Sequence, residues 1–139
     1  MSQKTTITIE ATIHAPVEKV WNAWTDTNAI TQWNCASPDW HSPKAEHELK
    51  PGGKFLYRME AKDGSFGFDF GGHFDIVKPN EYLESTIGDG RKIKTSFIDK
   101  GNETLVSETF EAEDTNPIEM QKTGWQSILD NFKKYVENH

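Results

Sequence analysis

Glu108 is the residue of this sequence whose chemistry most needs an explanation. It lies in a predicted strand, with Val106 and Phe110 two positions to either side of it. Successive side chains of a strand point to opposite faces, so Glu108 faces the core if Val106 and Phe110 do. A carboxyl group in an apolar core needs a partner and has a raised pKa, which would make it a functional candidate. The opposite phase, with Leu105 inward, makes Glu108 a surface charge, and the sequence leaves both phases open.

His73 is the second titratable candidate. Phe70 and Phe74 lie near it on one strand, and so do Asp69 and Asp75. Strict alternation places the three polar side chains on one face and the two phenylalanines on the other. A histidine that titrates near neutral pH can act as an acid or base, or orient a polar ligand atom. The favoured interpretation, however, is a solvated or hydrogen-bonded strand histidine.

The other histidines and the cysteine match no known metal or nucleophile motif. His41, Glu46, His47 and Glu48 are close in sequence, but the spacing of the two histidines is not that of a zinc site. Cys35 has no second cysteine to pair with and no base positioned to activate it. The sequence contains neither a Walker loop nor a Gly-x-Ser-x-Gly elbow. We therefore predict no metal and no cofactor, and find no convincing catalytic constellation.

Aromatic side chains are frequent and supply the remaining candidates. Phe, Trp and Tyr make up 12% of the chain, with five Trp and eight Phe. Cores built from large flat rings pack coarsely, which favours an internal cavity. Trp24, Trp33 and Trp40 could form a lid over such a cavity or a cluster that holds a loop in place. For Trp40 the anchoring role is favoured.

Apolar residues alternate with polar ones through much of the chain, as they do in half-buried strands. We predict strands over residues 5–14, 45–49, 55–59, 66–77, 82–87, 92–98 and 104–111. Between residues 34 and 43, two prolines and the lack of a period predict a loop. Gly67, Gly71 and Gly72 predict bulges or sharp bends within one strand. Strands joined by short turns form an antiparallel meander, whose apolar face needs a cover.

Apolar residues at helical spacing predict the helices that cover this apolar face. Two short helices follow Pro16, the second ending at Trp33, and a long helix follows residues 114–117. Residues 114–117 are expected to start this last helix, with a capping residue followed by Pro117 at the first helical position. Its apolar stripe consists of Ile118, Trp125, Ile128, Leu129, Phe132 and Val136. The predicted fold is α+β, a helix-grip in which a curved antiparallel sheet of about six to seven strands wraps around the C-terminal helix.

Length and charge limit the classes of function. A chain of 139 residues fits a single domain over residues 1–139. The net charge of −7 disfavours binding to nucleic acid or to anionic membranes. No apolar run approaches the roughly 18 residues of a membrane span, and the N-terminus lacks the plan of a signal peptide. With Cys35 as its single cysteine, the chain is expected to be cytoplasmic.

Four segments, taken in order, resemble a known family. The run I-x-A-P-V-E-K-V-W-N-A-W-T-D over residues 13–26, followed by Trp33, is similar to the start of the START-like (SRPBCC) superfamily. One branch of this superfamily is indicated by three further segments, K-P-G-G-K-F (50–55), G-H-F-D-I (72–76) and E-T-F (108–110). These segments resemble the branch related to the C-terminal domain of the activator of the heat-shock-protein-90 ATPase. The resemblance covers residues 5–136.

The resemblance implies a deep hydrophobic cavity between helix and sheet, which relatives use for lipids, sterols, polyketides or plant hormones. It therefore implies that Trp125 lines a cavity where the residues alone would also allow a solid core. Because the same fold hosts carriers, cyclases and co-chaperone domains, membership does not define one function. Together with the aromatic pattern, it gives the ligand-cavity candidates Trp24, Trp33, Trp40, Tyr57, Phe70, His73, Glu108, Trp125 and Leu129.

The first functional hypothesis is binding of a small hydrophobic molecule, lipid or polyketide-like, in that cavity. A cyclase or dehydratase is the second, with Glu108 or His73 as the acid or base. A co-chaperone-like interaction domain is the third. The eukaryotic co-chaperone of this branch makes much of its chaperone contact through a separate N-terminal domain. Since the first predicted strand begins a few residues after Met1, we do not expect activation of a chaperone ATPase.

Overall fold

The fold is one curved sheet with a long helix across its concave side. The computed structural model describes residues 5–139. All seven strands form one antiparallel sheet in the order β1-β7-β6-β5-β4-β3-β2. The strands are β1 (Thr6–Ile13), β2 (Trp40–His47), β3 (Lys54–Ala61), β4 (Gly67–Lys78), β5 (Tyr82–Ile87), β6 (Lys92–Asp99) and β7 (Thr104–Glu111). The helices are α1 (Val17–Thr25), α2 (Thr27–Trp33) and α3 (Ile118–Asn138). The predicted α+β helix-grip is confirmed.

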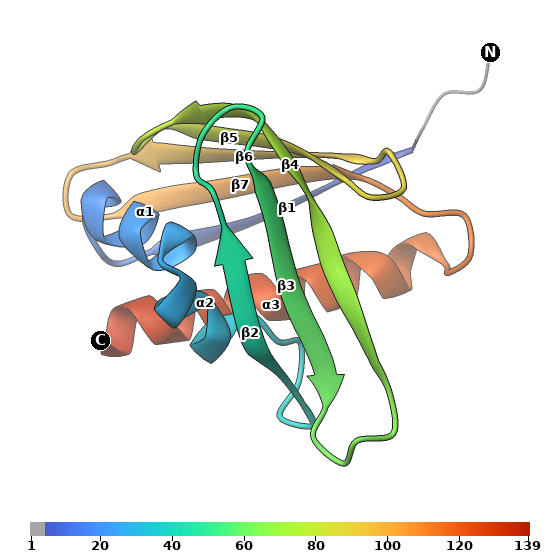
Figure 1. Cartoon of the computed structure of the whole chain (residues 1–139). Helices are drawn as coiled ribbons and strands as arrows, with labels where there is room; N and C mark the ends of the chain where they lie inside the picture. Colours follow the sequence, from blue (N-terminus) through green and yellow to red (C-terminus); the bar gives the residue numbers. More distant parts are fainter. Residues whose placement is uncertain (1–4) are drawn as a thin grey trace.

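The sheet is bent into two parts, and α3 lies on its concave side. Figure 1 shows β2 and β3 turned away from the part formed by β1, β7, β6 and β5, with α3 in the angle between them. The long β4 belongs to both parts, and its ladder to β5 shifts register between Phe74 and Ile76. At Gly72 a Cβ atom would lie 2.1 Å from the carbonyl oxygen of Thr86, so only glycine permits this approach. The bend opens space between the sheet and the helix.

The solid part of the core lies at the α1 end of α3. Leu129, Phe132 and Val136 of α3 are buried in one cluster with the inner residues of β1 and β7. The Phe132 ring is edge-on to Trp24 and Trp33, with centroid distances of 4.9 and 4.8 Å. Burying such a side chain stabilises the fold by about 1.5–3 kcal/mol. Among residues 5–139, no helix combines the length and the apolar character that crossing a membrane requires.

The loop prediction for residues 34–43 is wrong at its C-terminal end. β2 begins at Trp40 and ends at His47, earlier at both ends than the predicted strand. Pro43 is accommodated because β2 is an edge strand and its register with β3 shifts between His41 and Lys44. Proline has no N–H to donate, so edge positions and bulges are the places in a sheet that tolerate it.

The predicted cap of the C-terminal helix is also wrong in detail. Pro117 precedes the helix as its N-cap residue, without a side-chain capping bond, and α3 begins at Ile118. The Gln121 amide group holds this end of the helix instead. Its Nε2 donates to the backbone oxygens of Glu113 and Asn116, at 3.1 and 2.8 Å, and its Oε1 accepts from the backbone N–H of Glu113 at 2.9 Å. These hydrogen bonds join residues five to eight positions apart, outside the capping patterns by which a helix start is recognised in a sequence.

Candidate functional site

A pocket of about 470 Å³ lies between the concave face of the sheet and α3. This volume falls in the range of about 300–1,000 Å³ that is typical of small-molecule sites. All three helices and strands β3 to β7 contribute to its walls. Eight of the 23 lining residues are aromatic: Trp24, Trp33, Phe55, Tyr57, Phe68, Phe70, Phe74 and Trp125.

Trp125 forms the helix side of the pocket. Its ring stacks on Phe110 of β7, with centroids 3.8 Å apart and planes at 12°. It also lies edge-on to Phe70 of β4, at 6.2 Å. Trp125 therefore covers β7 with one surface and joins the two parts of the bent sheet. Such ring pairs contribute about 0.5–1.5 kcal/mol each beyond their burial.

Trp24 and Trp33 close the pocket at the end formed by α1 and α2. Their ring centroids are 5.2 Å apart. The indole Nε1–H of Trp33 donates to the Ala23 carbonyl at 2.9 Å, so this ring is held in one orientation. A buried indole needs such a partner for its N–H. The two tryptophans therefore belong to a fixed wall of the pocket.

Glu108 points into the pocket. Val106 and Phe110 are both buried, and Glu108, which shares their phase on β7, is 8% exposed. Burial raises the pKa of this carboxyl to about 7, and the hydrogen bond from Thr95 opposes the rise. The Thr95 hydroxyl donates to Glu108 Oε2 over a long 3.3 Å. Of the two phases left open by the sequence, the inward one is the one adopted.

Ser85, Thr95 and Glu108 form what we call the inner polar cluster. All three are buried, and all three line the pocket from successive strands β5, β6 and β7. Thr95 is paired with Glu108 across β6 and β7. Ser85 is paired with Ile93 and is therefore a diagonal neighbour of Thr95. The cluster places a short polar strip on an otherwise apolar floor.

Tyr57 adds a neutral polar edge. Its hydroxyl lies 2.9 Å from His47 Nδ1 on the neighbouring strand β2. Burial raises the pKa of Tyr57 well above its usual range and lowers the pKa of His47. Both side chains are therefore uncharged at neutral pH. Tyr57 contributes a ring and a hydroxyl to the wall, and no charge.

The mouth of the pocket lies between β4 and the start of α3. Met120 is 63% exposed and Phe68 is 43% exposed, although both line the pocket. Arg91 and Glu113 are the charged lining residues besides Glu108. The Arg91 Nε donates to Asp89 Oδ2 at 2.7 Å, so this guanidinium is already paired.

Gly124 is a pocket residue that our reading of the sequence missed. It lies within α3, lines the pocket, and a Cβ atom added to it would meet nothing within 4 Å. A glycine inside a helix costs about 1 kcal/mol relative to alanine, which is the signal that could have found it. Its position next to Trp125 leaves helix backbone open to the pocket.

The sequence model of the family described as Activator of Hsp90 ATPase homolog 1-like protein matches residues 14–137. The chain belongs to this family. None of the curated proteins matches the chain at a significant level. The family's fold commonly binds small hydrophobic ligands.

Solved structures of bacterial proteins have the same fold. A family member from Aeromonas hydrophila, solved by NMR, is 46% identical and superposes with a TM-score of 0.91, covering 96% of this chain and 93% of its own. A protein from Cytophaga hutchinsonii is 51% identical, with a TM-score of 0.83 and coverage of 96% and 92%. A Chromobacterium violaceum protein at 23% identity, with a TM-score of 0.86 and coverage of 96% and 98%, shows the shared fold alone.

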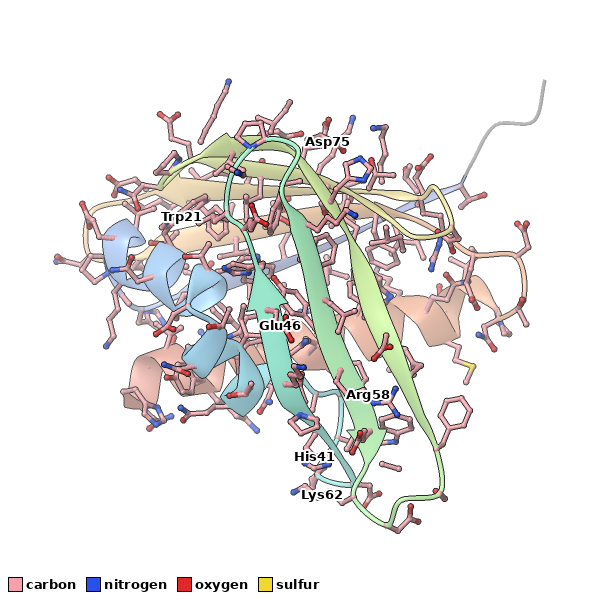
Figure 2. All side chains as sticks on the ribbon, in the orientation of Figure 1. Trp21, His41, Glu46, Arg58, Lys62 and Asp75 are labelled. Carbon is pink, nitrogen blue, oxygen red and sulfur yellow. The ribbon has the colours of Figure 1, made fainter. Side chains whose placement is uncertain are left out.

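In this member of the activator family, the pocket wall includes six of the cavity candidates: Trp24, Trp33, Tyr57, Phe70, Glu108 and Trp125. His73 lies outside the pocket. Its side chain is 50% exposed, and its Nε2 lies 3.1 Å from Asp75 Oδ1. Asp75 is on the side of the sheet opposite α3, as Figure 2 shows. The alternation that turns Phe70 and Phe74 inward turns His73 outward.

Trp40 and Leu129 are also absent from the pocket wall. The Trp40 ring packs against Phe66 and Phe68, with centroid distances of 5.9 and 6.1 Å, where β2 meets the β3–β4 hairpin. The anchoring role of Trp40 stays a prediction. Leu129, 1% exposed, is part of the solid core, because it follows Trp125 by one helical turn, toward the end of α3 that packs most tightly.

The described residues 5–139 contain no group of three or more His, Cys, Asp or Glu side chains placed to hold a metal ion. Cys35 accepts a hydrogen bond from Asn131 Nδ2 at 3.3 Å, and burial raises the pKa of its thiol. A raised pKa lowers the thiolate fraction and with it the nucleophilicity of the sulfur.

Proposed function

We propose that this protein binds a small hydrophobic molecule in the pocket between the sheet and α3. The observation that carries the proposal is the pocket itself, about 470 Å³ with mainly apolar walls in which eight of the 23 lining residues are aromatic. A few polar groups within an apolar wall are the usual composition of a site that binds and orients a small ligand. The family's fold, which commonly hosts such ligands, supports the same function.

The compartment and the partner are parts of the same proposal. We place the protein in a reducing compartment such as the cytoplasm, which the single free Cys35 and the net charge of −7 support. The proposal concerns an interior pocket and does not extend to the chaperone contact that the family name describes.

The uncharged fluorescent probe N-phenyl-naphthylamine is expected to bind saturably and to receive excitation energy from the tryptophans. Three of the five tryptophans, Trp24, Trp33 and Trp125, line the pocket, so a probe there lies within a few ångströms of their rings. A probe concentration of a hundred times its Kd should stabilise the fold by about 2.7 kcal/mol, seen as a rise in Tm.

Two matched variants locate this probe. Trp125→Phe should lower the affinity, because it removes a pocket wall, whereas Trp40→Phe should leave the affinity unchanged. Absence of saturable probe binding and of any thermal shift would refute the proposal. Equal effects of the two variants would place the probe elsewhere.

We propose acid–base catalysis in the same pocket, as in a cyclase or dehydratase, as the second candidate function. The observation favouring it is Glu108, whose pKa of about 7 suits proton transfer at neutral pH. The aldol adduct of benzaldehyde and acetone tests it. Wild type should speed its loss of water to benzalacetone, and Glu108→Gln should not. In this step the Glu108 carboxylate takes the α-proton of the ketone and passes it to the departing hydroxyl, so that water leaves as the C=C bond forms. Equal rates with both proteins, measured by absorbance of the enone, would remove this candidate.

A further inference from the structure

We infer that the ligand of this pocket carries an uncharged hydrogen-bond acceptor, a ketone or ester carbonyl, and that Glu108 donates a hydrogen bond to it from within the inner polar cluster. This inference rests on the proposed function, because it names the class of molecule that the pocket takes. It follows from three features of Glu108: its place in the pocket, its hydrogen bonds and the charges around it.

Glu108 lies on the pocket floor, and its carboxyl group can form further hydrogen bonds. Within residues 5–139 the structure gives this carboxyl one hydrogen bond, donated by Thr95 to Oε2 at 3.3 Å. The other oxygen, Oε1, is not engaged by that bond. On β1, the residue paired with Glu108 is the apolar Ile9. A buried polar group without a hydrogen-bond partner is energetically costly, and a ligand that enters the pocket can supply the partner.

Among residues 5–139, no cation is paired with this carboxyl. The titratable pocket residues besides Glu108 are Tyr57 of β3, Arg91 before β6 and Glu113 after β7. The pocket residues that belong to the helices and to strands β4, β5 and β6 are not titratable. Arg91 is bound to Asp89 Oδ2 at 2.7 Å and to the Glu111 carbonyl at 3.3 Å. Tyr57 is held by His47. Burial therefore outweighs the opposing hydrogen bond from Thr95 and favours the protonated form of Glu108, in which the carboxyl O–H is a donor.

A protonated carboxyl on an apolar floor distinguishes ligands by their polar group. A carbonyl oxygen accepts a hydrogen bond from the carboxyl O–H, so that donor and acceptor are paired. A hydrocarbon of the same shape leaves the donor unpaired, and sites that hydrogen-bond a ligand reject analogues that lack the bond. A carboxylate ligand must lose its hydration in an apolar wall without a free cation. The geometry thus favours a neutral carbonyl over both alternatives.

Three molecules of nearly equal shape test the inference: benzylacetone (ketone), isopentylbenzene (hydrocarbon) and hydrocinnamate (carboxylate). Their Kd values can be measured by chemical-shift titration of the labelled protein about one pH unit below and one above the pKa of about 7. Benzylacetone should bind most tightly at the lower pH. Its Kd should rise about tenfold at the higher pH, because only the protonated carboxyl donates.

Variants separate this role from a structural one. Glu108→Gln should keep the preference for the ketone and lose its pH dependence, because the amide N–H₂ donates at both pH values. Glu108→Leu should bind ketone and hydrocarbon alike. Glu10→Gln, on the exposed face of β1, is the matched control and should behave as wild type. Dispersed spectra establish that each variant is folded, and Glu108→Gln decides alone if Glu108→Leu does not fold.

The outcomes are distinguishable from failure of the proposed function. Equal affinities of wild type for ketone and hydrocarbon would overturn the inference and leave hydrophobic binding intact. Tightest binding of hydrocinnamate would overturn it in favour of a carboxylate ligand. If none of the three molecules nor N-phenyl-naphthylamine binds, the proposed function falls and the inference falls with it.

Discussion

Glu108→Gln is expected to stabilise the protein near pH 8 by up to about 3 kcal/mol and to change its stability little near pH 4. The folded-state pKa of Glu108 is about 7, against an ordinary value of 4.5. Between these values the folded protein holds a proton that the unfolded chain releases. The free energy of unfolding therefore falls as the pH rises through this window, and the full cost is present above pH 7. Glutamine has the same shape without the charge, so the cost disappears.

Urea unfolding of both proteins across this pH range checks the prediction. The difference between wild type and Glu108→Gln should grow from about pH 4.5 to pH 7 and then level off. Glu10→Gln, a matched change at an exposed position of the adjacent strand, should show no such growth. A difference that is the same at both ends of the range would mean that burial does not raise the pKa of Glu108.

Gly124→Phe is expected to weaken binding of N-phenyl-naphthylamine, raising its Kd by at least about tenfold, while Gly124→Ala leaves binding nearly unchanged. A Cβ atom at Gly124 enters open space, so a larger side chain can occupy the pocket without moving the backbone. Alanine should also stabilise the fold by about 0.5–1 kcal/mol, because it favours the helix more than glycine does. The same position therefore separates helix stability from pocket volume.

Probe titration and thermal unfolding of the two variants give the two readouts. Thr123→Phe places the same ring on the exposed neighbouring position of α3 and serves as the control for an added aromatic. Full binding by Gly124→Phe, with its fold intact, would show that the probe does not occupy the pocket. A loss of stability in Gly124→Ala would show that the backbone at this position does not tolerate a side chain.

Glu108 and Gly124 are both residues that weaken the fold where they stand. A buried carboxyl without a cation costs stability above its pKa, and a glycine inside a helix costs helix propensity. Both line the same pocket, one on the sheet and one on the helix. Local choices that conflict with stability are typical of functional sites. This coincidence is independent of the family resemblance and points to the same place.

Much of the fold could be predicted from the local spacing of apolar residues along the sequence. The alternation in β1, β5, β6 and β7 and the helical stripe of α3 were enough to predict these elements and the sheet they form. The reason is that a strand or helix must bury one face, and the spacing of apolar residues shows which residues share it. The start of β2 escaped this reasoning, since Pro43 is allowed only because that strand became an edge.

The site needed the tertiary structure. Alternation says that Glu108 shares a face with Val106 and Phe110, but not that this face is the covered one. Pairing with Ile9 and Thr95 on the two neighbouring strands, beneath α3, decided that. The sequence by itself therefore determined which side chains lie together along each element, because that depends on local geometry. Only the bend of the sheet around α3 decided which of them line a pocket, because that depends on contacts between segments far apart in the chain.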